Sequence, residues 1–211
     1  MTDRPGPARG VATFLLADIS GYTSFLHGVA EAHRAIIIEV DEPPPAYALL
    51  SSLIDAMVEN LSPRFRVAKL EGDALFALAD DPTPIRGEAL LDSLRACYAA
   101  FSELLGNANA TWTCTCDACS RIHGLDLKFV LHHGTYVVQR IVGNEELAGP
   151  DVIVVHRLLK NHARDLVGDR PYALLSDASI AALDVPVDGM QAAVEQYEDM
   201  PPIPVHVLAL A

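Results

Sequence analysis

Residues 14–23 read FLLADISGYT, an apolar run that stops at Asp18 and is followed by a glycine, an aromatic residue and a threonine. The run begins at residue 11 and lacks the alternation of a half-exposed strand. A continuous apolar run of this length is typical of a buried central strand. An acid at the end of a rigid strand faces a loop, where proteins commonly bind hard cations and phosphates.

A second acid lies in a similar setting. Residues 69–76 read KLEGDALF, so Asp73 stands between two short apolar runs. Gly72 predicts a hairpin turn between strands at residues 65–70 and 74–79. If the fold brings Asp18 and Asp73 together, the two carboxylates form a divalent-metal site of the kind used in phosphoryl transfer.

The composition excludes several classes of partner. The chain has 211 residues, 51% of them hydrophobic and 20% charged, which is typical of one globular domain. Its formal net charge of −13 disfavours binding to nucleic acid or to an anionic membrane surface. No apolar run approaches the roughly 20 residues that span a bilayer. We therefore expect a cytoplasmic protein without a nucleic-acid or membrane partner.

Strands and helices interleave along the chain with several hairpins, which indicates an α+β sandwich. We expect a flexible arm at residues 1–10 and a single domain at residues 11–211, with an irregular cysteine-rich insertion at residues 106–124. Helices are expected at residues 23–39, 46–61, 85–105, 150–163 and 177–183. Further strands are expected at residues 125–133, 136–142, 172–175, 194–198 and 205–210. Gly134 is expected to form the hairpin turn between the first two of these strands.

The insertion contains a second group of candidate ligands. Cys114, Cys116, Cys119 and His123 give the pattern Cys-x-Cys-x₂-Cys-x₃-His. Zinc binds tetrahedral sets of thiolate and imidazole, although the gap between its cysteine ligands is usually two residues or more. Three alternatives stay open, namely a structural zinc site, reduced cysteines in a loop and a redox switch. Cys97 lies in a predicted helix and is expected in the core.

Four stretches together resemble the catalytic domain of class III adenylyl and guanylyl cyclases. Residues 14–23 resemble the first metal motif of that family, and residues 69–73 resemble the second, with a Lys four residues before the Asp. Residues 131–134, LHHG, resemble a strand ending in His-x-Gly. Residues 149–158, GPDVIVVHRL, resemble the helix that brings an Asn and an Arg to the triphosphate. The chain also resembles a bacterial stand-alone branch of uncharacterised cyclase-like proteins with a Cys-x-Cys-x-x-Cys insertion.

The resemblance implies a ferredoxin-like cyclase sandwich with a central, mostly antiparallel sheet and flanking helices. It implies that Asp18, Asp73 and the carbonyl of Ile19 bind two Mg²⁺ or Mn²⁺ ions. A purine nucleotide, with ATP favoured, would then be read by Lys69 and Glu146, while Arg157 stabilises charge on the transferring phosphate. The resemblance further implies a homodimer whose site combines residues of both subunits.

Two departures from the family pattern argue against efficient turnover. Ile153 stands where the family has a ribose-directed Asn, and the acidic residues Glu198 and Asp199 stand in the late loop where the family has Lys. Arg140 or Lys160 would have to supply the missing positive charge. We therefore expect nucleotide binding with weak or absent cyclisation to a 3′,5′-cyclic nucleotide. The alternative is a catalytically degenerate domain that binds a ligand or a partner.

Overall fold

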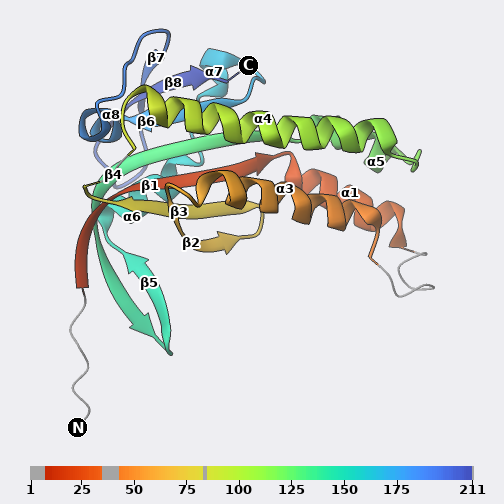
Figure 1. Cartoon of the computed structure of the whole chain (residues 1–211), viewed down its shortest axis with the longest axis horizontal. Coiled ribbons are helices and arrows are strands. Elements are labelled where there is room, and N and C mark those ends of the chain that lie inside the picture. Colours follow the sequence, from red (N-terminus) through yellow and green to blue (C-terminus); the bar gives the residue numbers. More distant parts are fainter. Residues whose placement is uncertain (1–7, 35–42, 83–84, 211) are drawn as a thin grey trace.

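The computed structural model describes residues 8–34, 43–82 and 85–210 (Figure 1). The expected N-terminal arm lies mostly outside these residues, but residues 8–10 are part of the first strand. The helices in chain order are α1 (Tyr22–Ala32), α3 (Pro45–Leu61), α4 (Glu88–Thr111), α5 (Asp117–Ser120), η1 (Arg121–Gly124), α6 (Pro150–Leu158), α7 (Arg164–Val167) and α8 (Asp177–Leu183). The strands are β1 (Ala8–Ser20), β2 (Arg66–Glu71), β3 (Ala74–Asp80), β4 (Asp126–Ile141), β5 (Asn144–Ala148), β6 (Tyr172–Ser176), β7 (Gln191–Glu195) and β8 (Ile203–Ala209).

The strands form one eight-stranded sheet in the order β2-β3-β1-β4-β6-β8-β7, with β5 paired to the far part of β4. Every pairing is antiparallel except that of β4 with β6. β1 is central and pairs with β3 on one side and β4 on the other. This arrangement confirms the expected α+β sandwich with a mostly antiparallel sheet.

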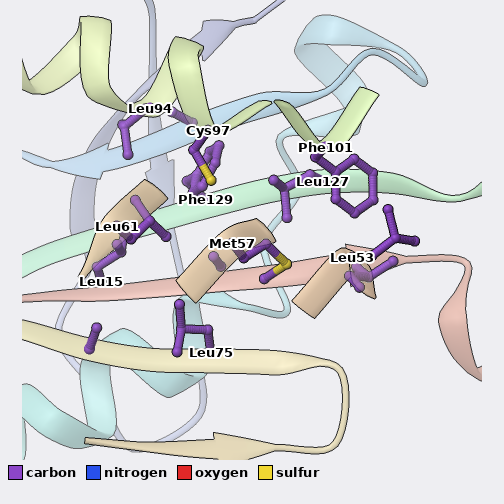
Figure 2. Packing of buried hydrophobic residues seen from close by; sticks show 14 of the residues in the cluster. Leu15, Leu53, Met57, Leu61, Leu75, Leu94, Cys97, Phe101, Leu127 and Phe129 are labelled. Carbon is purple, nitrogen blue, oxygen red and sulfur yellow. The ribbon is translucent and has the colours of Figure 1, made fainter. Parts of the chain in front are cut away.

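Helices cover both faces of the sheet, so β1 is buried on both sides. Its residues Leu15 and Ala17 point into a core shared with α1, α3 and α4. Figure 2 shows this core, in which Leu53, Met57 and Leu61 of α3 face the sheet. Phe14 and Leu16 point into a second core under α6. Because side chains alternate along a strand, Asp18 lies on this α6 side.

β4 differs from the expectation. It continues through Gly134 as one long strand, where the sequence predicted two strands and a turn. The true hairpin turn lies further on, at Val142 and Gly143, and leads into β5. Gly134 is needed because the first turn of α6 packs against it: a Cβ at Gly134 would lie 2.3 Å from Cγ of Asp151. Close packing therefore explains this glycine, and chain reversal does not.

Several boundaries also differ from the expected ones. α4 continues to Thr111, and residues 117–124 form two short helices, so the expected irregular insertion is largely helical. α6 ends at Leu158, five residues before the expected end. α1 ends at Ala32, although the helix was expected to continue to residue 39. Residues 35–39 of that expectation lie outside the described residues. Among the residues described, none of the helices combines the length and the apolar character needed to cross a membrane.

Candidate functional site

The end of β1 brings together two acids and a lysine. Asp18 lies opposite Ala74 of β3, so the neighbouring hairpin residue Asp73 is close to it. On the other side Asp18 lies opposite Lys128 of β4, whose Nζ is 2.9 Å from Oδ2 of Asp18. Both side chains of this ion pair are largely buried, with 17% of Asp18 and 18% of Lys128 exposed. Lys128 also donates to the carbonyl of Leu159, just after α6, at 3.3 Å.

The electrostatics of Asp73 reflect this neighbourhood. Burial raises the pKa of Asp73, and the negative charge of Asp18 raises it further, while Lys128 lowers it. The phenol of Tyr22, at the start of α1, also has a raised pKa because of burial and the charge of Asp73. The negative charge of Asp18 thus disfavours ionisation of Asp73. Both carboxylates offer oxygen ligands to a cation, whose positive charge would offset this repulsion.

The first turn of α1 borders the same acids. Gly21 separates β1 from α1 and has a φ of 83°, a left-handed conformation that glycine adopts without strain. No side chain caps the start of this helix. The side chain of Ile19 is buried in the core on the other face, so only the backbone of this residue can serve a site on the α6 side. Its expected role as a carbonyl ligand stays a prediction.

Lys69 and Glu146, expected to read the base, come together on the surface. Nζ of Lys69 is 2.7 Å from Oε1 of Glu71 and 3.4 Å from Oε2 of Glu146. The hydrogen bond from Lys69 to Glu71 is the main reason why the pKa of Lys69 is raised. Both Lys69 and Glu146 keep about two fifths of their side chains exposed, 40% and 42%. The pair is therefore accessible to a ligand, with Glu71 as a competing partner.

α6 carries the remaining expected site residues. The side chain of Arg157 is exposed and has no hydrogen bond or ion pair with any residue in the described ranges. Ile153, one helical turn earlier, is 56% exposed, so the two side chains share an outward face. The neighbouring His156 faces the sheet, where its Nε2 is 3.4 Å from Oε2 of Glu71.

The two histidines of the LHHG stretch have structural partners. His132 is buried between the hydroxyl of Ser176, at 2.8 Å, and Oδ1 of Asp151, at 3.3 Å. Burial lowers the pKa of His132, although the carboxylate of Asp151 acts in the opposite direction. Asp151 also accepts from the backbone N–H and the hydroxyl of Thr135, and these bonds outweigh burial to lower its pKa. This network fastens α6 to the sheet.

The cysteines gather around a histidine that the sequence reasoning did not select. Cys114, Cys116 and Cys119 lie with His33, and their ligand atoms are all within 4.8 Å of one another. His123 is not part of this cluster. It is exposed and lines a separate cavity of about 280 Å³ with Gly21 and other residues. Cys97 is buried in the core, as expected.

Lys128 was also missed, since only Arg140 and Lys160 were considered as sources of the positive charge that the late loop lacks. Arg140 lies in the exposed part of β4 and pairs with Glu145 at 3.1 Å, while Lys160 is exposed beyond α6. The alternation of side chains along the strand expected at residues 125–133 could have indicated Lys128. It is two residues from Val130 and four from His132, so all three point to the α6 face. Only the pairing of β1 with β4 brings it beside Asp18.

Solved structures with similar folds are nucleotide cyclase domains. The guanylyl cyclase Cya2 superposes with a TM-score of 0.69 at 16% identity, over 98% of this chain and 100% of that one. The adenylyl cyclase CyaB from P. aeruginosa gives a TM-score of 0.67 at 14% identity, over 96% and 95%. The catalytic core of a rhodopsin-guanylyl cyclase, solved in complex with ATPalphaS, gives 0.57 at 13% identity, over 98% and 99%. These similarities establish the class III adenylyl and guanylyl cyclase fold.

Sequence comparison points to a less characterised group. The Uncharacterized protein Rv2561/Rv2562 of Mycobacterium tuberculosis is 35% identical over 136 residues. That region makes up 64% of this chain, which spans only 59% of the length of this curated relative. A family model described as "Protein of unknown function (DUF2652)" matches residues 49–165, more than half of the chain. The chain therefore belongs to the DUF2652 family.

Proposed function

We propose that this protein is a class III nucleotide cyclase-like protein that binds a purine nucleoside triphosphate with a divalent metal and converts it weakly or not at all. One observation carries the proposal: two carboxylates, Asp18 and Asp73, lie close together beside Lys128 at the end of the central strand. A local cluster of acids and a cation is what a small anionic ligand with its metal requires in a chain of net charge −13.

Asp18 and Asp73 fit a divalent cation by the chemistry of their donors. Hard cations such as Mg²⁺ and Mn²⁺ prefer carboxylate and carbonyl oxygens, and Mg²⁺ sites commonly use one or two carboxylates together with substrate phosphates. Burial and the charge of Asp18 raise the pKa of Asp73, and a bound cation would favour its ionised form instead. A bound metal would supply Lewis-acid assistance to a ribose hydroxyl and charge neutralisation to the triphosphate.

Lys128 gives the site a positive charge of its own. Its ammonium group lies 2.9 Å from Oδ2 of Asp18 and donates a hydrogen bond to the Leu159 carbonyl. If Asp18 turns to a metal, Lys128 loses its anionic partner while remaining partly buried, which favours a new anion such as a phosphate. The uncapped first turn of α1 adds backbone N–H groups suited to the same anion.

The base-reading role of Lys69 and Glu146 belongs to the same proposal. Their 3.4 Å contact places a donor and an acceptor side by side on an accessible surface. Glu146 could accept from the exocyclic amino group of adenine, which favours ATP. The purine base would have to compete with Glu71 for Lys69, whose Nζ is 2.7 Å from Oε1 of Glu71. We therefore expect modest affinity for the base.

The expected weakness of turnover rests on α6 and on the late loop. The exposed side chain of Ile153 offers no hydrogen bond to a ribose, although Arg157 beside it is free to contact phosphate. Glu198 and Asp199 are exposed acids in the loop between β7 and β8. Loss of one preorganised charge stabiliser typically costs about 100- to 1000-fold in rate, so two losses leave binding as the main activity.

A homodimer would complete this site. The unpartnered Arg157 and the exposed Ile153 form an outward face that a second subunit can cover. The hairpin of β4 and β5 also projects from the sheet (Figure 1), and its tip residues Ile141 and Val142 are 53% and 98% exposed. Apolar residues at the tip of a projecting hairpin are suited to contact with another chain.

The alternative function is a catalytically degenerate domain that binds another ligand or a protein partner. The apolar, exposed Ile153 favours it, because a side chain suited to an interface stands where the resembled enzymes position a ribose. In that case Asp18 and Asp73 would be the remnant of a metal site that no longer binds metal, and Asp18 would keep only its ion pair with Lys128. The two functions differ in whether metal and nucleotide bind together.

Calorimetric titration of the purified protein with a non-hydrolysable ATP analogue tests the proposal, with and without Mn²⁺. We expect binding that needs Mn²⁺ and is lost in Asp18→Asn and Asp73→Asn, because each removes a metal ligand. Lys128→Gln should weaken phosphate binding. Asp92→Asn, which removes an exposed acid paired with Arg95 on α4, is the matched control and should bind normally.

The same protein should then be incubated with Mn²⁺ and ATP or GTP, followed by mass-spectrometric detection of cyclic nucleotide. Little product together with metal-dependent binding would support the proposal as stated. Robust turnover that disappears in Asp73→Asn would show that Ile153 and the acidic loop matter less than we argue. Absence of metal-dependent binding in a folded wild-type protein would favour the partner-binding alternative.

A further inference from the structure

The cysteine cluster lies where three distant segments meet. His33 caps the C-terminal end of α1, Cys114 and Cys116 follow α4, and Cys119 is in α5. A cavity of about 170 Å³ next to the cluster is also lined by Pro44, Pro45 and Ala46 at the start of α3. The sequence separation between His33 and Cys114 is 81 residues, so the cluster exists only in the folded chain.

The geometry of the cluster is that of a metal shell. Nε2 of His33 lies 3.5 Å from Sγ of Cys114, 3.4 Å from Sγ of Cys116 and 3.5 Å from Sγ of Cys119. Around a tetrahedral zinc ion, with bonds of about 2.3 Å to sulfur and about 2.0 Å to nitrogen, sulfur and nitrogen are separated by about 3.6 Å. The three distances agree with that value to within a few tenths of an ångström.

Ordinary hydrogen bonds do not account for this arrangement. An imidazole nitrogen carries one proton or one lone pair, so it can satisfy one thiol well and not three at once. A disulfide would join two of the sulfurs and leave the third and the histidine without a role. Three sulfurs lie at nearly equal distances from one imidazole nitrogen, and all four donor atoms are within 4.8 Å of one another. An ion between them best explains this convergence.

A tryptophan beside the cluster supplies an independent observation. Nε1 of Trp112 is buried and has no hydrogen-bond partner among the described residues. Trp112 and Cys119 line the same cavity of about 170 Å³. A buried indole N–H without a partner is therefore available to stabilise a thiolate at Cys119. Donors of this kind commonly support metal-bound sulfur.

We propose that His33, Cys114, Cys116 and Cys119 bind a structural zinc ion that fastens the end of α1 to the segment after α4. Four protein ligands leave no open coordination position, which distinguishes a structural from a catalytic zinc site. Zinc is favoured over harder cations because three of the donors are sulfur.

The zinc site would hold α1 at the end opposite the acids. α1 begins next to Asp18 and ends at His33, and it packs closely on α5, where a Cβ at Gly28 would be 3.2 Å from Cβ of Ala118. The ion therefore fixes the helix whose first turn borders the carboxylate pair. The site itself stands whether or not a nucleotide binds.

Metal analysis of the purified full chain tests the site, with His33→Ala and His123→Ala as a matched pair. We expect about one zinc per chain in the wild type and in His123→Ala, and loss of zinc in His33→Ala. Replacement of zinc by Co²⁺ should give the visible absorption of tetrahedral cobalt with thiolate charge-transfer bands. Trp112→Phe, which removes only the N–H, should weaken zinc affinity by about 10-fold.

The structural role has its own readout, because metal bound only to the folded state adds to its stability. Release of zinc from the wild type by a chelator should lower the thermal midpoint, and the same chelator should leave the midpoint of His33→Ala unchanged. If His33→Ala does not fold, the wild-type metal content and cobalt spectrum still decide the question. A folded wild type without bound metal and without a cobalt–thiolate spectrum would overturn the proposal, as would zinc loss in His123→Ala with retention in His33→Ala.

Discussion

Gly134 determines whether α6 can lie against the sheet. Asp151 at the start of α6 occupies the space where a Cβ would be, and it is held there by bonds from Thr135 and His132. Gly134 of the LHHG stretch and Asp151 of the GPDVIVVHRL stretch thus pack directly against each other. The same contact keeps Arg157 and Ile153 on their outward face, because both belong to the helix that it fastens.

Gly134→Ala should therefore destabilise the protein by roughly 1–3 kcal/mol, because the new methyl group displaces a hydrogen-bonded carboxylate. The free energy of unfolding from urea denaturation measures this. Gly106→Ala is the control, since Gly106 lies in α4 with nothing within 4 Å of an added Cβ. It should stabilise by roughly 0.5–1 kcal/mol, as alanine favours a helix interior. An unchanged stability of Gly134→Ala would mean that Asp151 moves without cost.

At the scale of elements, the hairpin of β4 and β5 has a valine at a turn position that usually requires asparagine or glycine. Its two-residue turn has φ values of 51° at Val142 and 88° at Gly143. Turns with two left-handed residues favour Asn-Gly, whereas a β-branched residue there is strained. Val142 is nonetheless 98% exposed, so its side chain gains nothing within the subunit. Strain without an internal benefit is consistent with a contact outside the subunit.

Val142→Asn should stabilise the isolated subunit by roughly 1 kcal/mol, because asparagine tolerates the left-handed conformation. Thermal or urea unfolding of the monomer checks this. Val187→Asn provides the comparison, since Val187 is also exposed, at 42%, and its φ is negative. That variant should have nearly wild-type stability. Equal effects at the two positions would show that the turn conformation is not the cause.

At the scale of the whole molecule, the proposed dimer makes each site from two chains. A mixed dimer of Asp73→Asn and Arg157→Ala subunits has one site with both changes and one site with neither. Random co-expression should therefore restore about a quarter of the wild-type metal-dependent nucleotide binding, although each variant alone binds poorly. Binding measurements on the purified mixture check this. No recovery in confirmed mixed dimers would place Asp73 and Arg157 in the same subunit's site or in none.

Much of the fold was predictable because the apolar patterns are strong. The central strand at residues 11–17, the hairpin around Gly72 and the helix at residues 46–61 were all correctly placed. The hairpin at Gly134 was wrong, since a glycine required for close packing looks like one required for a turn. Sequence alone could not reveal that the glycine faces Asp151.

The composition of the candidate sites was harder to predict than the fold. The candidate acids Asp18 and Asp73 could be selected from their local motifs, but Lys128 depends on which strands pair. The cysteine spacing left a zinc site and reduced cysteines open, and the residue that lies with the three cysteines is His33, far away in the chain, and not the nearby His123. Local spacing identifies residues that share a motif, whereas long-range packing decides which residues complete a site.

The central place of β1 also affects how the chain is made. β1 leaves the ribosome before β3 and β4, its two neighbours in the sheet, which are synthesised much later. The pairing of β1 with β4 joins residues that are more than 100 positions apart, such as Leu15 and Leu131. Such long-range pairing slows folding. The nascent chain must therefore keep its most apolar strand from aggregating until β4 emerges, which makes this segment the natural point of engagement for a chaperone.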